Sequence, residues 1–421
     1  MVLPQKCGGT EFMAVRLAAV AAAAALLALV ARRVRGARRG ALRRARERAP
    51  PRAVAEVRVW MDGVFDLMHF GHANAFRLGR AQGTYLVVGV NDDESVTRLK
   101  GAPLMSEDER AAAVAGCRWV DEVVRRVPYV MDDAYVRALL DEHKIDFILH
   151  GDDPCIVDGR DVYEVAIRLG KYRTVPRTEG ISTTDVLRRM LSAGAHQGER
   201  RSAPEPPSAA SHFLLTARML ADFAPAARAP RDEPRCVVYL DGAFDLLHAG
   251  HVAAMRAARA LGDFLIVGVH DDATVRRVCP AAQPVLTLNE RVMGVLGCRH
   301  VDDVLISPPW LLSREMIASL AIAVVVRARV DDEAEACEQS ICERYETART
   351  LDIYAELRCD EFAQLRASQL VRRACERESQ LSSRVARKAE AERDYYRARY
   401  GLDMDARPSA SAAKGKEGEG L

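Results

Sequence analysis

The sequence lacks the patterns that mark several common classes of protein. It contains no C-x-x-C pair and only ten cysteines in 421 residues, so we expect neither a zinc site nor a disulfide scaffold. It contains no G-x-x-x-x-G-K-[ST] motif, and no G-x-G-x-x-G follows an expected strand. We therefore expect neither a P-loop nor a dinucleotide-binding loop. With 49% hydrophobic and 29% charged residues the chain is not mainly disordered, and its length predicts two domains.

The net charge is also small, but the value of +2 is the sum of a basic segment and an acidic one. Residues 1–50 contain ten arginines and one lysine against two acids, which gives this segment +9 and leaves −7 for the rest of the chain. A mildly acidic body is not the charge pattern of a nucleic-acid-binding domain. We therefore expect no nucleic-acid partner and look for another partner of the basic segment.

An uninterrupted apolar run occupies residues 17–31, and nine arginines follow it within residues 32–48. With the apolar residues just before Arg16, the run approaches the length that spans a bilayer. We expect residues 1–51 to be a hydrophobic anchor helix with an arginine-rich collar, in which residues 13–48 contact anionic lipids and the body lies on the cytosolic side. A cleaved transit peptide and a secretory signal are the alternatives.

An internal repeat predicts the architecture. Residues 59–72 and 238–251 are identical at nine of fourteen positions, at a constant offset of 179 residues. Two further segments of the first copy, 86–93 and 117–123, match 265–272 and 298–304 in the second. Such agreement over separate segments indicates two copies of one domain.

Within the first copy, β-rich runs alternate with segments of helical apolar spacing. Expected strands cover 57–61, 84–90, 122–127 and 146–149, and expected helices cover 71–81, 133–142, 162–169 and 184–191. Helices also begin after Ser106 and Thr287, each with a glutamate three residues later in a capping box. The alternation predicts an α/β fold with parallel sheets, whose ligand binds at the carboxyl ends of the strands.

Composition shifts along the chain predict the domain boundaries. We expect domains at 52–194 and 235–378, a Gly-, Pro-, Ser- and Ala-rich linker at 195–234, and a charged helix with a disordered tail at 379–421. An apolar island at 211–218 within the linker is expected to dock on a domain.

One segment carries the chemistry: D-G-V-F-D-L-M-H-F-G-H, from Asp62 to His72, which leads from the first expected strand into the first expected helix. Gly63 and Gly71 let the backbone approach a ligand closely, and the helix N-terminus directs N–H groups to the same point. There His69 and His72 can face phosphates. Nucleotidyl transfer needs such donors, because negative charge builds on the α-phosphate and the departing pyrophosphate. A histidine pair in a turn is more often structural, but this pair occurs twice behind D-G-x-F-D.

H-x-G-H behind D-G-x-F-D resembles the signature of the nucleotidylyltransferase superfamily. The segment R-T-E-G-I-S-T-T at residues 177–184 is similar to the R-T-x-G-[IV]-S-[ST]-[ST] signature of cytidylyltransferases. Taken alone, it is a basic residue and a hydroxyl run before a helix, which is a second anion site. Two tandem copies, only the first with both signatures, resemble the ethanolamine-phosphate cytidylyltransferase family of the plant and algal type over residues 57–378. The resemblance implies two Rossmann-like nucleotidylyltransferase domains.

The resemblance also implies an enzyme that transfers the cytidylyl group of CTP to phosphoethanolamine, giving CDP-ethanolamine and pyrophosphate for phosphatidylethanolamine synthesis. The substrate phosphate attacks in line without a general base, and Mg²⁺ enters with CTP rather than on protein ligands. The implied catalytic residues are His69, His72, Lys100 and Arg177. The implied CTP-binding residues are Asp62, Gly63, Val64, Phe65, Asp66, Gly71, His150, Gly151, Asp152, Asp153, Thr178, Glu179, Gly180, Ile181, Ser182 and Thr183. Asp161 and Tyr163 are candidates for the ammonium end, through charge and cation–π contact.

The second copy departs from this pattern at the positions that matter. It keeps a remnant of the site in Ala243, Phe244, His248 and His251. Arg327-Ala328 stands where the first copy has His150-Gly151, no lysine matches Lys100, and acidic residues replace the hydroxyl signature. We expect no CTP turnover there, only weak nucleotide binding or a packing role.

Two alternatives to this function stay open. One is a different phospho-alcohol, phosphocholine or glycerol 3-phosphate; the duplication and the all-round charge of residues 380–400 disfavour it, since the choline enzyme pairs a single domain with an amphipathic lipid-sensing helix. The other is a membrane-tethered, non-catalytic nucleotide-binding scaffold, which the intact first-copy motifs disfavour. The resemblance implies the mitochondrial outer membrane or the endoplasmic reticulum, with a homodimer as a candidate assembly.

Overall fold

A computed structural model describes most of the two repeats. The described residues are 56–152, 155–157, 160–178, 180–196, 217–225, 235–278, 283–329 and 342–400. The chain divides into two units, Met1–Glu56 and Val57–Leu421, and both repeats belong to the second. The expected anchor and collar, most of the linker with the 211–216 part of its apolar island, and the tail after residue 400 lie outside the described residues. No helix in the described ranges is long and apolar enough to cross a bilayer.

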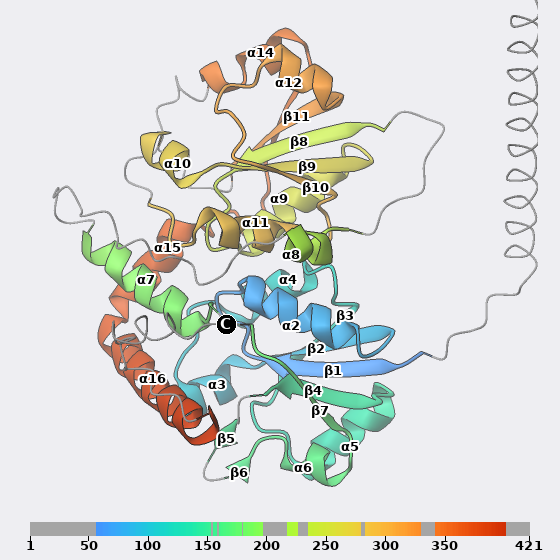
Figure 1. The fold of residues 1–421 in the computed structure, drawn as a ribbon, viewed down its shortest axis with the longest axis vertical. Coiled ribbons are helices and arrows are strands. Elements are labelled where there is room, and N and C mark those ends of the chain that lie inside the picture. Colours follow the sequence, from blue (N-terminus) through green and yellow to red (C-terminus); the bar gives the residue numbers. More distant parts are fainter. Residues whose placement is uncertain are drawn as a thin grey trace, which may run out of the picture. The chain divides into compact units, whose positions relative to one another are not determined.

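The first repeat is built on a five-stranded parallel sheet in the order β3-β2-β1-β4-β7 (Figure 1). Its strands are β1 (Arg58–Gly63), β2 (Tyr85–Asn91), β3 (Glu122–Val127), β4 (Phe147–Gly151) and β7 (Tyr172–Val175), with a short hairpin of β5 (Ile156–Val157) and β6 (Arg160–Asp161). Its helices are α2 (Phe70–Arg80), α3 (Asp93–Lys100), α4 (Glu107–Ala115), α5 (Asp133–Glu142), α6 (Glu164–Arg168) and α7 (Thr183–His196). The strand order reverses between β1 and β4, which is where such a sheet binds its ligand.

The second repeat has the same sheet, in the order β10-β9-β8-β11-β12. Its strands are β8 (Val237–Gly242), β9 (Phe264–Val269), β10 (Asp303–Ile306), β11 (Ile322–Ala328) and β12 (Tyr354–Leu357). The helices are α8 (Ala217–Phe223) from the linker, then α9 (Ala249–Arg259), α10 (Asp272–Val278), α11 (Leu288–Leu296), α12 (Arg314–Ser319), α14 (Glu346–Thr350), α15 (Ala367–Glu376) and α16 (Glu378–Tyr400). Two α/β copies with parallel sheets, as the internal repeat predicts, are confirmed.

Two elements near the site were not expected from the sequence. The edge strand β7 has two exposed residues among its four and shows no alternating pattern. Helix α3 begins after Asp92, whose Oδ1 accepts from the Ser95 N–H at 2.6 Å, and ends at Gly101 with φ +93°. This helix places Lys100 in its last turn.

The two repeats meet through contacts that are related by an approximate two-fold symmetry. The Arg118 N–H donates to the Gly297 carbonyl at 2.9 Å, and the Arg299 N–H donates to the Gly116 carbonyl at 2.8 Å. Helix α2 contacts α11, while α4 contacts α9 and α7 contacts α15. Each repeat therefore presents the same face to the other, as in an isologous dimer.

Two reciprocal ion pairs reinforce this contact. Arg189 of α7 holds Glu290 of α11 through two bonds of 2.7 and 3.1 Å. Arg373 of α15 holds Glu109 of α4 through two bonds of 2.8 and 3.0 Å. Both glutamates also close the capping boxes expected from the sequence. One side chain thus caps its own helix and binds the other repeat.

Candidate active site

The H-x-G-H segment forms the N-terminus of α2. His69 is the N-cap residue, and its Nδ1 accepts from the Gly71 N–H at 3.1 Å. The Nδ1 of His72 accepts from the His69 N–H at 3.3 Å, and the two rings stack with centroids 4.0 Å apart. Because Nδ1 is an acceptor in both rings, the proton of each neutral imidazole is on Nε2. The backbone therefore sets both histidines as Nε2–H donors.

Gly71 is required by close packing at this turn. A Cβ at Gly71 would lie 2.9 Å from ring atoms of His69 and 3.0 Å from the Cγ2 of Ile181. A Cβ at Gly63 would lie 3.0 Å from the Phe65 ring, whose backbone has φ 52°. Both glycines thus bring backbone and rings together around the ligand position, as their place in the motif predicts.

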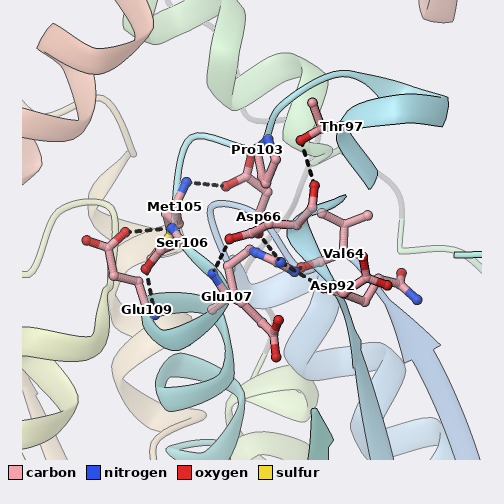
Figure 2. Close-up of polar contacts among 12 residues, drawn as sticks. Val64, Asp66, Asp92, Thr97, Pro103, Met105, Ser106, Glu107 and Glu109 are labelled. Carbon is pink, nitrogen blue, oxygen red and sulfur yellow. Dashed lines mark hydrogen bonds and ion pairs between the residues drawn. The ribbon is translucent and has the colours of Figure 1, made fainter. Parts of the chain in front are cut away.

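Asp66 organises the loops around the site. It is buried, and its two carboxylate oxygens accept from the N–H groups of Leu104 at 2.9 Å and Met105 at 3.0 Å. Burial raises the pKa of Asp66, although these two bonds oppose the rise. Figure 2 shows Asp66 reaching the backbone at Met105, next to the Ser106–Glu109 capping box of α4.

A buried arginine that the sequence analysis did not identify supports the same loop. Arg110 is fully buried and donates to the Val64 carbonyl, to the Asn91 carbonyl at 2.7 Å and to the Asp93 carboxylate at 2.6 Å. In the second repeat the equivalent Arg291 donates to the Ala243 carbonyl at 2.6 Å and also pairs with Asp272. An arginine directly after the capping-box glutamate in both copies was the available sequence signal.

A cavity of about 250 Å³ lies at the carboxyl ends of β1 and β4. The predicted site residues that line it are Asp62, Gly63, Val64, Phe65, Asp66, His69, Gly71, His72, Lys100, His150, Gly151, Arg177, Thr178, Ile181, Ser182 and Thr183. Asp152 and Gly180 lie beside it without lining it, while Asp153 and Glu179 lie outside the described residues. Leu187 of α7 and Arg384 and Val385 of α16 also line it, and no motif pointed to them.

Cationic groups and helix N-termini converge on this cavity. The Arg177 N–H donates to Asp152 Oδ1 at 3.3 Å, and the Lys100 Nζ lies 5.5 Å from the centroid of the Tyr129 ring. Ser182 accepts from the Asp185 N–H at 3.1 Å and so caps α7. Since α2 and α7 both begin at the cavity, two positive dipole ends act together with the two cations. Such a site suits a polyphosphate.

The cavity lining also includes a buried acid, Asp62. Its Oδ1 accepts from the Trp60 indole at 3.1 Å and from the Tyr163 hydroxyl at 3.3 Å. Burial raises the pKa of Asp62, and the charge of the nearby His150 opposes that rise. The Tyr163 ring lies behind Asp62 and outside the lining, packed on His150 at 4.7 Å. Asp161 does not line the cavity, since its Oδ1 accepts from the Tyr163 N–H.

In the second repeat, the aspartate that corresponds to Asp62 is paired within the protein itself. Arg344, which is fully buried, pairs with Asp241 at 2.7 Å, while the Tyr345 hydroxyl donates to the same oxygen at 2.9 Å. Although burial opposes ionisation, Arg344 and His270 hold the pKa of Asp241 well below its usual value. Asp241 and Tyr345 occupy the positions of Asp62 and Tyr163 in the first repeat. An internal guanidinium therefore pairs with the aspartate that corresponds to Asp62.

The histidines of the second repeat are also closed off. His248 and His251 are both 0% exposed, whereas His69 is 8% exposed and lines a cavity. Burial, together with His251 and Arg366, lowers the pKa of His248 well below its ordinary value. The second copy thus keeps the motif but presents it to packed protein.

Comparison with known proteins supports the resemblance found in the sequence. The family model described as cytidylyltransferase-like matches residues 60–189 and 239–385. An ethanolamine-phosphate cytidylyltransferase of Arabidopsis thaliana is 39% identical over 363 residues, which cover 81% of this chain and 85% of that protein. A Dictyostelium discoideum protein of the same name is 41% identical over 349 residues, which cover 79% of this chain and 94% of that protein. A choline-phosphate cytidylyltransferase of Arabidopsis thaliana is 42% identical, but over only 32% of this chain.

Proposed function

Because this chain belongs to the ethanolamine-phosphate cytidylyltransferase family, we propose that its first repeat transfers the cytidylyl group of CTP to phosphoethanolamine in the cavity between β1, α2 and α7. The products are CDP-ethanolamine and pyrophosphate, and the reaction serves phosphatidylethanolamine synthesis. The observation that carries the assignment to this cavity is the pair of Nε2–H donors beside two helix N-termini. That arrangement matches the charge that develops during the reaction.

The chain's own groups account for the main steps. A phosphate monoester has a second pKa near 6, so its oxygen is already a nucleophile at neutral pH and needs no general base. It attacks the α-phosphorus in line as the bond to pyrophosphate breaks. His69 and His72 donate to the oxygens that gain charge, and Lys100 and Arg177 hold the triphosphate.

Magnesium fits this site as part of the nucleotide complex. Of the two acids that line the cavity, Asp66 has both oxygens bonded to backbone, and no cluster of three metal-binding side chains occurs among the described residues. We therefore expect the phosphates of CTP to supply the ligands. Bound in that way, Mg²⁺ would supply positive charge to the leaving pyrophosphate.

We place the ammonium of phosphoethanolamine against Asp62. The second repeat supports this, because its equivalent Asp241 pairs with the positive group of Arg344 while the Tyr345 hydroxyl donates to the same carboxylate. In the first repeat the Tyr163 hydroxyl orients the carboxylate, and the ligand supplies the positive charge. Tyr163 is then a positioning residue.

A substrate panel with the Asp62→Asn variant tests the function and this placement together. We expect the full chain to release pyrophosphate from CTP with phosphoethanolamine and not with glycerol 3-phosphate. Loss of one charged hydrogen bond should raise the KM for phosphoethanolamine about 10- to 100-fold, with the KM for CTP unchanged.

The controls separate the alternatives. Tyr163→Phe should raise the KM for phosphoethanolamine by a smaller factor, because the carboxylate remains. A preference for phosphocholine would contradict the assignment of phosphoethanolamine as the substrate. No turnover with any of these substrates would favour the non-catalytic nucleotide-binding scaffold. An equal rise in the KM for CTP would place Asp62 on the nucleotide, as the family resemblance first implied.

We also propose that residues 1–51 attach the enzyme to a membrane of the endoplasmic reticulum or the mitochondrial outer membrane, with both repeats in the cytosol. The support is the apolar run 17–31 followed by nine arginines. The full chain should float with vesicles containing phosphatidylserine, and a chain that begins at residue 52 should stay in the soluble fraction. Equal flotation, or a mature N-terminus after the collar in cells, would contradict the anchor.

A further inference from the structure

Helix α16, the last described element, contributes two side chains, Arg384 and Val385, to the lining of the catalytic cavity. It packs against α7, the helix that follows the hydroxyl signature (Figure 1). Leu381 is buried, and Val385 packs against the apolar core and lines the cavity. Arg384 is three residues after Leu381, so the two are neighbours on the helix surface, and Arg384 also lines the cavity. Arg387, by contrast, is exposed.

Arg384 lines the cavity with Lys100 and Arg177. Within the described residues no carboxylate forms an ion pair with it. Its charge lowers the pKa of Asp66, but both oxygens of that carboxylate are already bonded to the N–H groups of the loop before α4. The Arg384 guanidinium thus belongs to the cavity lining and forms no ion pair with a carboxylate of the described residues.

Arg384, Lys100 and Arg177 line one cavity. Three cations around a single cavity favour a ligand with several negative charges, and in CTP most of that charge is on the β- and γ-phosphates. A guanidinium offers paired donors that match phosphate oxygens.

We propose that Arg384 of α16 binds the β- and γ-phosphates of CTP in the first repeat, together with Lys100. This inference rests on the proposed function and extends it. The site that carries out the reaction is then completed by a helix that follows the second repeat. This dependence on α16 gives the second repeat a role even if it catalyses no reaction itself. Helix α15 and the contact between the repeats hold α16 at the cavity.

Replacing Arg384 with glutamine tests the proposal in the full chain. Arg384→Gln should weaken binding of CTP and raise its KM about tenfold, since one charge-assisted hydrogen bond is lost. The Kd of CMP, which lacks the β- and γ-phosphates, should change less than about twofold. Product inhibition by pyrophosphate should weaken together with CTP binding, and Arg384→Lys should restore part of the affinity.

Arg387→Gln is the matched control, because it removes the same charge from a residue of α16 that is exposed and does not line the cavity. It should leave the KM for CTP and the Kd of CMP at the wild-type values. Equal CTP binding by the two variants would overturn the proposal, as would higher activity in Arg384→Gln, which would make α16 an inhibitory cover. If wild type binds CTP but forms no CDP-ethanolamine, the proposed function fails while the comparison of CTP with CMP still decides the role of Arg384.

Discussion

Replacing His69 or His72 with alanine is expected to lower kcat by about 10²- to 10³-fold at saturating substrates. Each variant removes an Nε2–H donor that the backbone holds in place through Nδ1, and loss of one preorganised donor to a developing charge has an effect of this size. Steady-state release of pyrophosphate measures it. Because the donors act mainly in the transition state, the Kd of CTP should change much less than kcat.

Two sets of control variants separate chemistry from folding. His69 also caps α2, so His69→Ala should lower the free energy of unfolding by about 1 kcal/mol. His69→Asn retains a capping acceptor and should keep that stability, yet it should be as inactive as the alanine variant. His248→Ala and His251→Ala change the buried pair of the second repeat and should leave kcat unchanged. Full activity in both first-repeat variants would refute the assignment.

Replacing Arg110 with methionine is expected to lower the free energy of unfolding by about 3 kcal/mol, as measured by urea unfolding. The substitution leaves the carbonyls of Val64 and Asn91 buried without their donor and the Asp93 carboxylate without its ion pair. We also expect a large loss of kcat at temperatures where the variant is folded, since Val64 belongs to the loop that precedes His69 and lines the cavity.

Arg291→Met provides the matched comparison. Arg291 is equally buried and makes the corresponding contacts in the second repeat, so the loss of stability should be similar. The catalytic loop is untouched, and kcat should stay at the wild-type value. A wild-type unfolding curve for Arg110→Met would contradict the structural role, and an equal loss of kcat in Arg291→Met would attribute the effect to stability alone.

The sequence predicted those parts of the molecule that local pattern and motif specify. The four expected strands of the first sheet, the capping boxes at Ser106 and Thr287 and the meeting of His69 with Arg177 at one cavity all follow from short-range signals. Strand β7 was not predicted because an exposed edge strand needs no alternation of apolar and polar residues. Its existence depends on pairing with β4, which is a long-range property.

The missed site residues share one physical cause. Arg110 and Arg344 look like surface arginines in the sequence, but tertiary partners make their burial favourable. Arg384 lies more than 300 positions after His69, in a helix whose charged composition resembles any solvated helix. Only the packing of Leu381 and of α7 turns it toward the cavity. Side chains placed by distant contacts carry no local signature.

The symmetric contact between the repeats has a consequence for assembly. Two separate copies joined through this face would come apart on dilution, with a midpoint set by their dissociation constant. Here the partner is on the same chain, at a fixed effective concentration, so the pairing is the same at one molecule per cell as at millimolar enzyme. The pairing of the two repeats is therefore independent of expression level. In a homodimer every substitution appears on both sides of the interface. Here each repeat has its own sequence, so a substitution changes only one side.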